Sequence, residues 1–154
     1  MEGIDRLLKE HPFFEGMRHE YLEMIAGCGS NVRFDEGDYL GREGESADVF
    51  FAIRHGRVAL EIPCGDEPIT VQTVDEGDIV GWSWLFPPYQ WLFDARALET
   101  TRAVRFDCTC LRTKCEADPA MGYEFMKRFA GVVVERFRST RLQLIDVYAS
   151  QLKV

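Results

Sequence analysis

The sequence predicts a mainly β protein: an antiparallel jelly roll or barrel with helices before it and one long helix after it. Two observations carry this prediction. Between residues 31 and 106, runs of four to six residues rich in Val, Ile, Phe and Tyr alternate with glycine and acidic turns such as DEGD. These runs lie too close together for crossover helices, so their strands pair antiparallel. On both sides of this region the apolar residues recur at helical spacing instead.

The elements follow in order along one domain. Amphipathic patterns predict helices over 4–9 and 18–27, which form an N-terminal part spanning 1–30. The β-roll is expected over 31–107, with an irregular aromatic segment at 81–93. A helical part at 108–154 begins with a short helix in DCTCLRTKCEAD. Asp118 and Pro119 then favour a helix start, and no proline interrupts the chain from there to 150.

The long helix over 119–150 carries more apolar surface than its own roll can cover. About 30 helical residues span about 45 Å. A helix packed on its own roll would account for 119–132 but not for 137–148, so we expect a homodimer through this helix. The apolar stripe expected to make this contact consists of Met126, Phe129, Val133, Phe137, Leu144 and Tyr148. Arg128, Arg136, Arg138 and Arg141 are expected to form a solvated basic face.

Composition restricts the class of protein. No apolar run reaches the ~20 residues of a membrane span, and the first residues do not form a secretory signal. The net charge of −8 argues against nucleic-acid binding by this chain. Five cysteines, an odd number, favour reduced thiols and a cytoplasmic location.

The stretch from HPFFEGM at 11–17 to HGRVAL at 55–60 resembles the cyclic nucleotide-binding domain of the catabolite activator (Crp/Fnr-like) family. Gly37, Gly44, Gly56 and Gly77 stand where that family has turn glycines, and the resemblance covers about residues 4–150. It implies a double-stranded β-helix roll, a dimerisation helix and a regulatory, signal-sensing role without enzymatic activity. Transcription regulators of the family continue into a helix-turn-helix domain. The Met start favours a complete short protein that does not read DNA by that mechanism.

The resemblance also implies where a ligand would bind, and there the chain departs from the family. The phosphate-binding cassette of the family uses a glutamate for the ribose hydroxyl, an arginine for the phosphate and the backbone of a short helix. Here Gly81 is kept, but the glutamate position is Trp82. Ser83, Trp84 and Leu85 follow, Pro87 and Pro88 come where the short helix should run, and the arginine position falls at about Trp91. In an alternative alignment Arg96 is the phosphate arginine; otherwise it is an outward-facing strand residue.

Cyclic nucleotide binding is therefore doubtful, and two uses of the segment remain open. The aromatic side chains of Trp82, Trp84, Phe86, Tyr89, Trp91 and Phe93 either line a pocket for haem or another apolar ligand, or fill the vacated pocket as core. Docking of a partner protein is a third use. The corresponding functions are a sensor with altered ligand specificity and a ligand-free dimerisation or interaction module.

Other candidate sites are weaker. The pattern C-x-C-x4-C at Cys108, Cys110 and Cys115 matches no strong metal motif, although Cys28, Cys64 or a histidine could add a fourth ligand to a metal or redox site. His11, His19 and His55 are expected to be solvated. No nucleophile–base pair or phosphate-loop motif indicates catalysis, and we expect no resident cofactor or metal.

Overall fold

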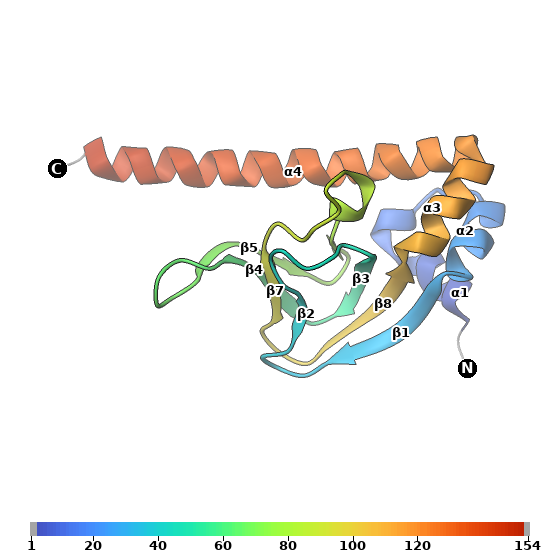
Figure 1. Ribbon diagram of the computed structural model, residues 1–154, viewed down its shortest axis with the longest axis horizontal. Helices are drawn as coiled ribbons and strands as arrows, with labels where there is room; N and C mark the ends of the chain where they lie inside the picture. The colour runs from blue at the N-terminus through green and yellow to red at the C-terminus, as the bar shows by residue number, and fades with distance from the viewer. Residues whose placement is uncertain (1–2, 153–154) are drawn as a thin grey trace.

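The roll consists of two four-stranded antiparallel sheets, which confirms the expected fold class (Figure 1). The computed structural model describes residues 3–152. One sheet has the order β1-β8-β3-β6 and the other β2-β7-β4-β5. The strands are β1 (Gly29–Phe34), β2 (Tyr39–Gly41), β3 (Val49–His55), β4 (Arg57–Ile62), β5 (Ile69–Asp75), β6 (Ile79–Val80), β7 (Asp94–Ala97) and β8 (Thr101–Asp107).

Helices flank the roll on both sides of the sequence, as the hydrophobic periodicity predicts. They are α1 (Ile4–Glu10), η1 (Pro12–Phe14), α2 (His19–Ala26), η2 (Ser83–Leu85), α3 (Cys108–Ala117) and α4 (Pro119–Leu152). The Asp118 side chain accepts a hydrogen bond from the Met121 N–H at 3.2 Å, which confirms the start of the long helix predicted from Asp118 and Pro119. Asp107 caps α3 in the same way, accepting from the N–H groups of Thr109 and Cys110.

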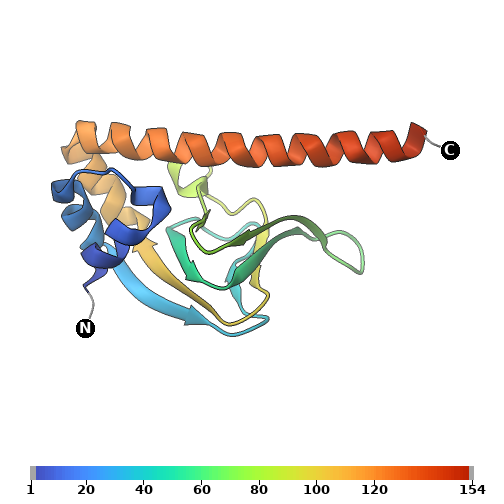
Figure 2. The same cartoon turned by 180° about the vertical axis from the view of Figure 1, so that it is seen from behind.

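Only the first part of α4 packs on the roll. Met121, Phe125 and Phe129 are buried, and Arg136 is the last buried residue along the helix. Phe129 packs on the ring of Phe50 with a centroid separation of 5.0 Å and thereby joins α4 to β3. Beyond Arg136 no described residue of α4 is buried, and the end of the helix projects beyond the roll (Figures 1 and 2). The helix therefore stays packed on the roll for one turn beyond residue 132, where we expected this packing to end.

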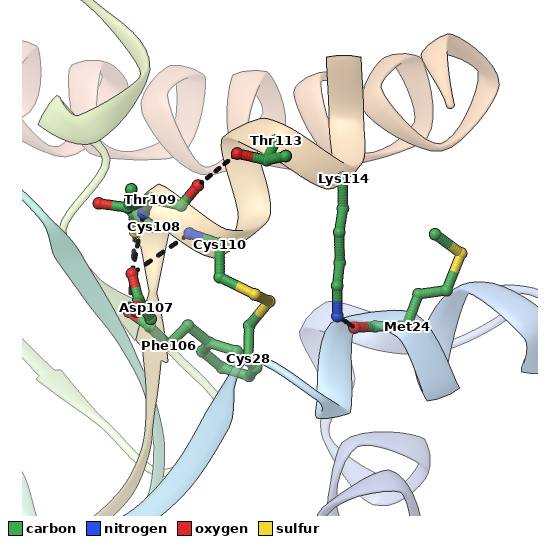
Figure 3. Close-up of a disulfide and its surroundings, with 9 residues drawn as sticks. All are labelled: Met24, Cys28, Phe106, Asp107, Cys108, Thr109, Cys110, Thr113 and Lys114. Atoms are coloured by element: carbon green, nitrogen blue, oxygen red, sulfur yellow. Dashed lines mark hydrogen bonds between the residues drawn. A yellow bond between two sulfur atoms is a disulfide. The ribbon is translucent and has the colours of Figure 1, made fainter. Parts of the chain in front are cut away.

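A disulfide joins the start of the roll to α3 (Figure 3). Cys28, just before β1, is bonded to Cys110 of α3 and closes a loop with a sequence separation of 82. The expectation of reduced thiols is wrong for these two residues, because the fold brings their Cα atoms to 5.9 Å. Beside the disulfide, Lys114 Nζ of α3 donates to the Met24 carbonyl of α2 and so ties α3 to the helix that precedes Cys28. No helix within residues 3–152 combines the length and apolarity that crossing a bilayer requires.

Candidate functional site: the interior of the roll

Trp91 occupies the space between the two sheets where a ligand would have to enter. Its side chain is 4% exposed. The ring lies against Gly41 of one sheet, where an added Cβ would be 2.6 Å from Cδ2 and Cζ2 of the indole. On the other side it lies against Gly81, where a Cβ would be 3.2 Å from Cη2. Two glycines thus leave room for one large ring, and the ring fills that room.

Backbone hydrogen bonds hold Trp91 in this position. The Trp91 N–H donates to the Glu45 carbonyl at 2.9 Å, and the Trp91 carbonyl accepts from the Gly44 N–H at 2.9 Å. Two residues earlier, the Tyr89 carbonyl accepts from the Ala47 N–H at 2.7 Å. The segment before β7 is therefore tied to the loop between β2 and β3, which fixes the backbone from which the Trp91 side chain projects.

The other cassette residues point to different places. Trp84 is 1% exposed and stacks on Phe50 at 5.8 Å, while Phe129 of α4 meets its ring edge-on at 5.5 Å. Trp84 is thus core between η2 and α4. Trp82 and Leu85 are half-buried, and Ser83 is buried at the start of η2. The indole N–H groups of Trp82 and Trp84 are buried and have no acceptor among the described residues. Phe86 and Tyr89 are exposed. The six aromatic residues expected to line one pocket therefore do not do so.

Arg96 is engaged by a carboxylate rather than presented to a ligand. Its Nε and Nη2 donate to the two oxygens of Glu61 at 2.8 and 3.2 Å, in a bidentate pair between β7 and β4. The Glu61 side chain is 4% exposed, and this hydrogen bonding raises the pKa of Arg96. Ala95 and Ala97 on either side are fully buried, so by strand alternation Arg96 lies on the opposite face of β7. This agrees with the outward-facing reading of Arg96.

Several cavities open on the described surface away from Trp91. Five cavities of about 310–380 Å³ open on it, and neither Trp91 nor Gly41 lines any of the five. One of them lies beneath η2 and α3 and includes Trp84 and Cys115. Between Gly41 and Gly81 the space is filled by the ring of Trp91.

The cysteines do not assemble into a cluster. Cys110 is committed to the disulfide, Cys64 is exposed, and Cys108 and Cys115 are free. Burial raises the pKa of both the Cys108 and the Cys115 thiol, which disfavours the thiolate that would ligate a metal. Within residues 3–152, no group of three or more His, Cys, Asp and Glu side chains is arranged to hold a metal ion.

His11 is a structural residue, contrary to the expectation that it is solvated. It is 7% exposed, its Nδ1 accepts from the Phe13 N–H at 3.2 Å, and its Nε2 lies 3.0 Å from the Ile53 carbonyl. The Nε2–H tautomer satisfies both contacts. His19 and His55 have exposed side chains, as expected, each beside a glutamate.

The stripe expected for dimerisation is only partly exposed. Phe129 belongs to the core of its own chain, at 1% exposure, because α4 turns this residue toward Phe50 and Trp84. The expectation that Phe129 belongs to the dimerisation stripe is therefore wrong. Val133 is half-buried. The remaining stripe residues are exposed: Met126 by 42%, Phe137 by 68%, Leu144 by 54% and Tyr148 by 59%.

The sequence did not indicate the roles of three residues, two at this site and one on α4. Gly41 and Glu61 lie on β2 and β4, far in sequence from the aromatic segment, and no local pattern links them to Trp91 or Arg96. Arg136 was assigned to a solvated basic face, but it is 9% exposed. One signal could have found it: Arg136 continues the buried series Met121, Phe125 and Phe129 at helical spacing.

Comparison with known proteins identifies the family and the fold. The family model described as "Cyclic nucleotide-binding domain" matches residues 31–118. Human cGMP-dependent protein kinase 2 is 27% identical over 82 residues, which are 52% of this chain and 11% of the kinase. The chain thus spans about a tenth of the length of the curated kinases it matches.

Solved structures share the fold over most of the chain. A candidate cyclic nucleotide-binding protein from Geobacter metallireducens has a TM-score of 0.78 and 28% identity, and the match covers 89% of this chain and 99% of that one. The regulatory subunit of a cAMP-independent protein kinase A from Trypanosoma brucei has a TM-score of 0.62 at 19% identity, covering 82% and 49%. The second likeness concerns the fold alone.

Proposed function

Because the chain belongs to the cyclic nucleotide-binding domain family, we propose that it is a regulatory, non-enzymatic module that works without a cyclic nucleotide in its roll. The observation that carries this proposal is the position of Trp91, whose ring is buried between Gly41 and Gly81. The core of such a module would be permanently completed by its own side chain instead of by a ligand.

The energetics favour the filled roll over nucleotide binding. A cyclic nucleotide would have to displace a buried indole, and burying a side chain of this kind stabilises a protein by roughly 1.5–3 kcal/mol or more. The nucleotide would also find neither the arginine nor the glutamate that the family uses to bind it. Each hydrogen bond that involves such a charged group contributes about 1.5–3 kcal/mol. Since 1.4 kcal/mol corresponds to a tenfold change in Kd, affinity would fall by several orders of magnitude.

The second part of the proposal is that the module acts as a homodimer. Its support is the projecting part of α4, where Phe137, Leu142, Leu144 and Tyr148 are each more than half exposed on a helix that no other element covers. Apolar surface of this extent on a soluble chain is typical of an interface. A second copy supplies the same helix and would bury the same residues. The cytoplasmic location predicted from the sequence remains a prediction, and the disulfide weakens the reduced-thiol argument on which it relied.

Restoring the family chemistry tests the first part. The variant carrying both Trp82→Glu and Trp91→Arg empties the interior and supplies the two missing polar groups. We expect it to gain a thermal stabilisation by cAMP or cGMP that the unaltered protein does not show. The matched control is Leu92→Arg, which adds the same charge at a neighbouring side chain that is 54% exposed. If cAMP or cGMP stabilised the unaltered protein as much as the double variant, the proposal would be contradicted.

A further inference from the structure

A cavity of about 370 Å³ lies where α4 leaves the roll. We call it the α4 cavity: it is enclosed by the α4 residues from Arg128 to Arg136, the ends of β5 and β6, and the turn at Pro12 and Phe13. Its volume is in the range of pockets that hold small organic ligands. It opens beside Gly131, where an added Cβ would meet no atom within 4 Å. The helix therefore borders open space at this residue.

The guanidinium of Arg136 reaches into this region with its hydrogen-bonding capacity partly unused. The residue is 9% exposed and lines the cavity. Its Nη2 donates to the Ile79 carbonyl, but Nη1 is buried and has no acceptor among the described residues. Burial lowers the pKa of Arg136 to about 10, so the group is still charged at neutral pH. The charge of Asp78, which lies beyond ion-pair distance, raises the pKa of Arg136 but does not offset the effect of burial. A buried charge without a direct ion-pair partner is costly, and an anion in contact with it would reduce that cost.

The other charged groups of the cavity already have partners. Arg128 donates to the Phe13 carbonyl at 2.6 Å and to Glu124 at 3.0 Å. The Asp78 carboxylate accepts from the Asp75 N–H at 3.1 Å, and Glu135 pairs with Arg138 at 2.9 Å. Within residues 3–152, no carboxylate lies within ion-pair distance of Arg136. Arg136 is thus the cationic group of this cavity that has no carboxylate within ion-pair distance.

We propose that the α4 cavity binds a small organic anion, with its carboxylate or phosphate accepting from Nη1 of Arg136. The apolar body of such a ligand would lie against Phe13, Val74 and Val132, which line the same cavity. Because Arg136 is the last buried residue of α4 and bonds to β6, the ligand would contact both the roll and the helix that projects from it. This site is separate from the roll interior and does not depend on the state of Trp91.

Calorimetric titration with benzoate and phenyl phosphate tests the proposal, with benzamide as the uncharged analogue of benzoate. We expect one of the two anions to bind with a Kd of about 1 mM or lower and benzamide to bind at least about tenfold more weakly. The relative affinity of the two anions distinguishes a carboxylate from a phosphate site. Arg136→Gln should weaken binding about tenfold or more, since it removes the charge and leaves a shorter, uncharged amide.

Two further variants separate binding from folding. Gly131→Met places a side chain in the open space of the cavity from an exposed helix position and should also abolish binding. Arg141→Gln removes an exposed arginine of the same helix that does not line the cavity and should leave binding unchanged. The proposal is overturned if neither anion binds or if Arg136→Gln binds the anion as tightly as the unaltered protein. It is also overturned if Arg136→Gln changes only the oligomeric state. That result would make a carboxylate of a second copy the partner of Arg136.

Discussion

The indole ring of Trp91 lies so close to Gly41 that no side chain fits between them: a Cβ at residue 41 would be 2.6 Å from Cδ2 and Cζ2 of the ring. Glycine at this position and tryptophan at 91 are therefore parts of one packing arrangement. It fills the roll from within and replaces the polar groups that the family uses for its ligand.

Gly41→Ala should destabilise the protein. The added methyl group must displace a buried ring that backbone bonds to Glu45 and Gly44 hold in place, and overpacking of this kind costs about 1–3 kcal/mol. Urea denaturation measures the loss. The control is Gly131→Ala, at a helical position with open space, which should leave stability unchanged or raise it by about 0.5–1 kcal/mol. If Gly41→Ala were as stable as the unaltered protein, Trp91 would not be held in the position described.

Much of the fold is predictable from the sequence, because it depends on local patterns. The change from helical to strand periodicity, the glycine turns and the Asp118 cap each determine structure within a few residues. The sequence also predicts the loss of the cassette, since Trp82 and Trp91 stand where the resemblance implies charged residues. What the sequence leaves open is whether the aromatic residues line a pocket or fill it. That depends on Gly41 and Gly81, which meet Trp91 only after the two sheets have packed.

The same reasoning explains the errors. Cys28 and Cys110 lie 82 residues apart, and only the packing of α3 beside the α2–β1 junction brings them together. His11 looks like a turn residue, but its two ring nitrogens connect the η1 turn to β3. Phe129 and Arg136 lie on a helix whose rotation about its axis is set by the roll beneath it. Each error concerns a contact between segments distant in sequence.

Stability should decrease in mild acid because of His11. Burial lowers the pKa of His11 below its ordinary value of 6.5, so folding favours the neutral ring. Below pH 6.5 His11 takes up a proton more readily in the unfolded chain than in the folded chain. The stability that the neutral His11 ring contributes is therefore lost as the pH falls toward the lower pKa of the folded state. Denaturation midpoints measured from pH 7.5 to 5 should show this decrease.

His19→Gln is the control for this prediction, since His19 has an exposed side chain. It should keep the decrease in stability, whereas His11→Gln should reduce the dependence on pH and lower stability at pH 7.5. A folded-state His11 pKa above 6.5, measured by NMR titration, would contradict the assignment of a buried neutral ring.

Reduction of the disulfide should destabilise the fold. Closing a loop of this length restricts the unfolded chain, and such bonds contribute about 2–4 kcal/mol. We expect dithiothreitol to lower the thermal midpoint of the unaltered protein and to have no effect on the Cys28→Ala and Cys110→Ala double variant. Cys64→Ala, at an exposed free cysteine, should behave like the unaltered protein. The same midpoint with and without reductant would show that the bond does not form in solution.

Phe137→Asp should convert the expected dimer to a monomer. Phe137 is 68% exposed on the part of α4 that leaves the roll, so a change there should not disturb the core of the chain. Placing a carboxylate in a desolvated helix interface costs about 3 kcal/mol or more, which corresponds to at least about a 100-fold weaker dimer. Sedimentation equilibrium measures the change, with Gln143→Asp as the control on another face of α4. A monomeric unaltered protein would refute dimerisation through α4.

The central claim is that Trp91 takes the place of the nucleotide, and calorimetric titration of the unaltered protein with cAMP and cGMP tests it most directly. We expect no binding in the roll at concentrations up to about 1 mM. Any weak anion binding that Arg136→Gln removes would belong to the α4 cavity. Micromolar binding of either nucleotide that persists in Arg136→Gln would contradict the claim, because it would require Trp91 to leave the space between Gly41 and Gly81 and the roll to supply a phosphate site from other residues.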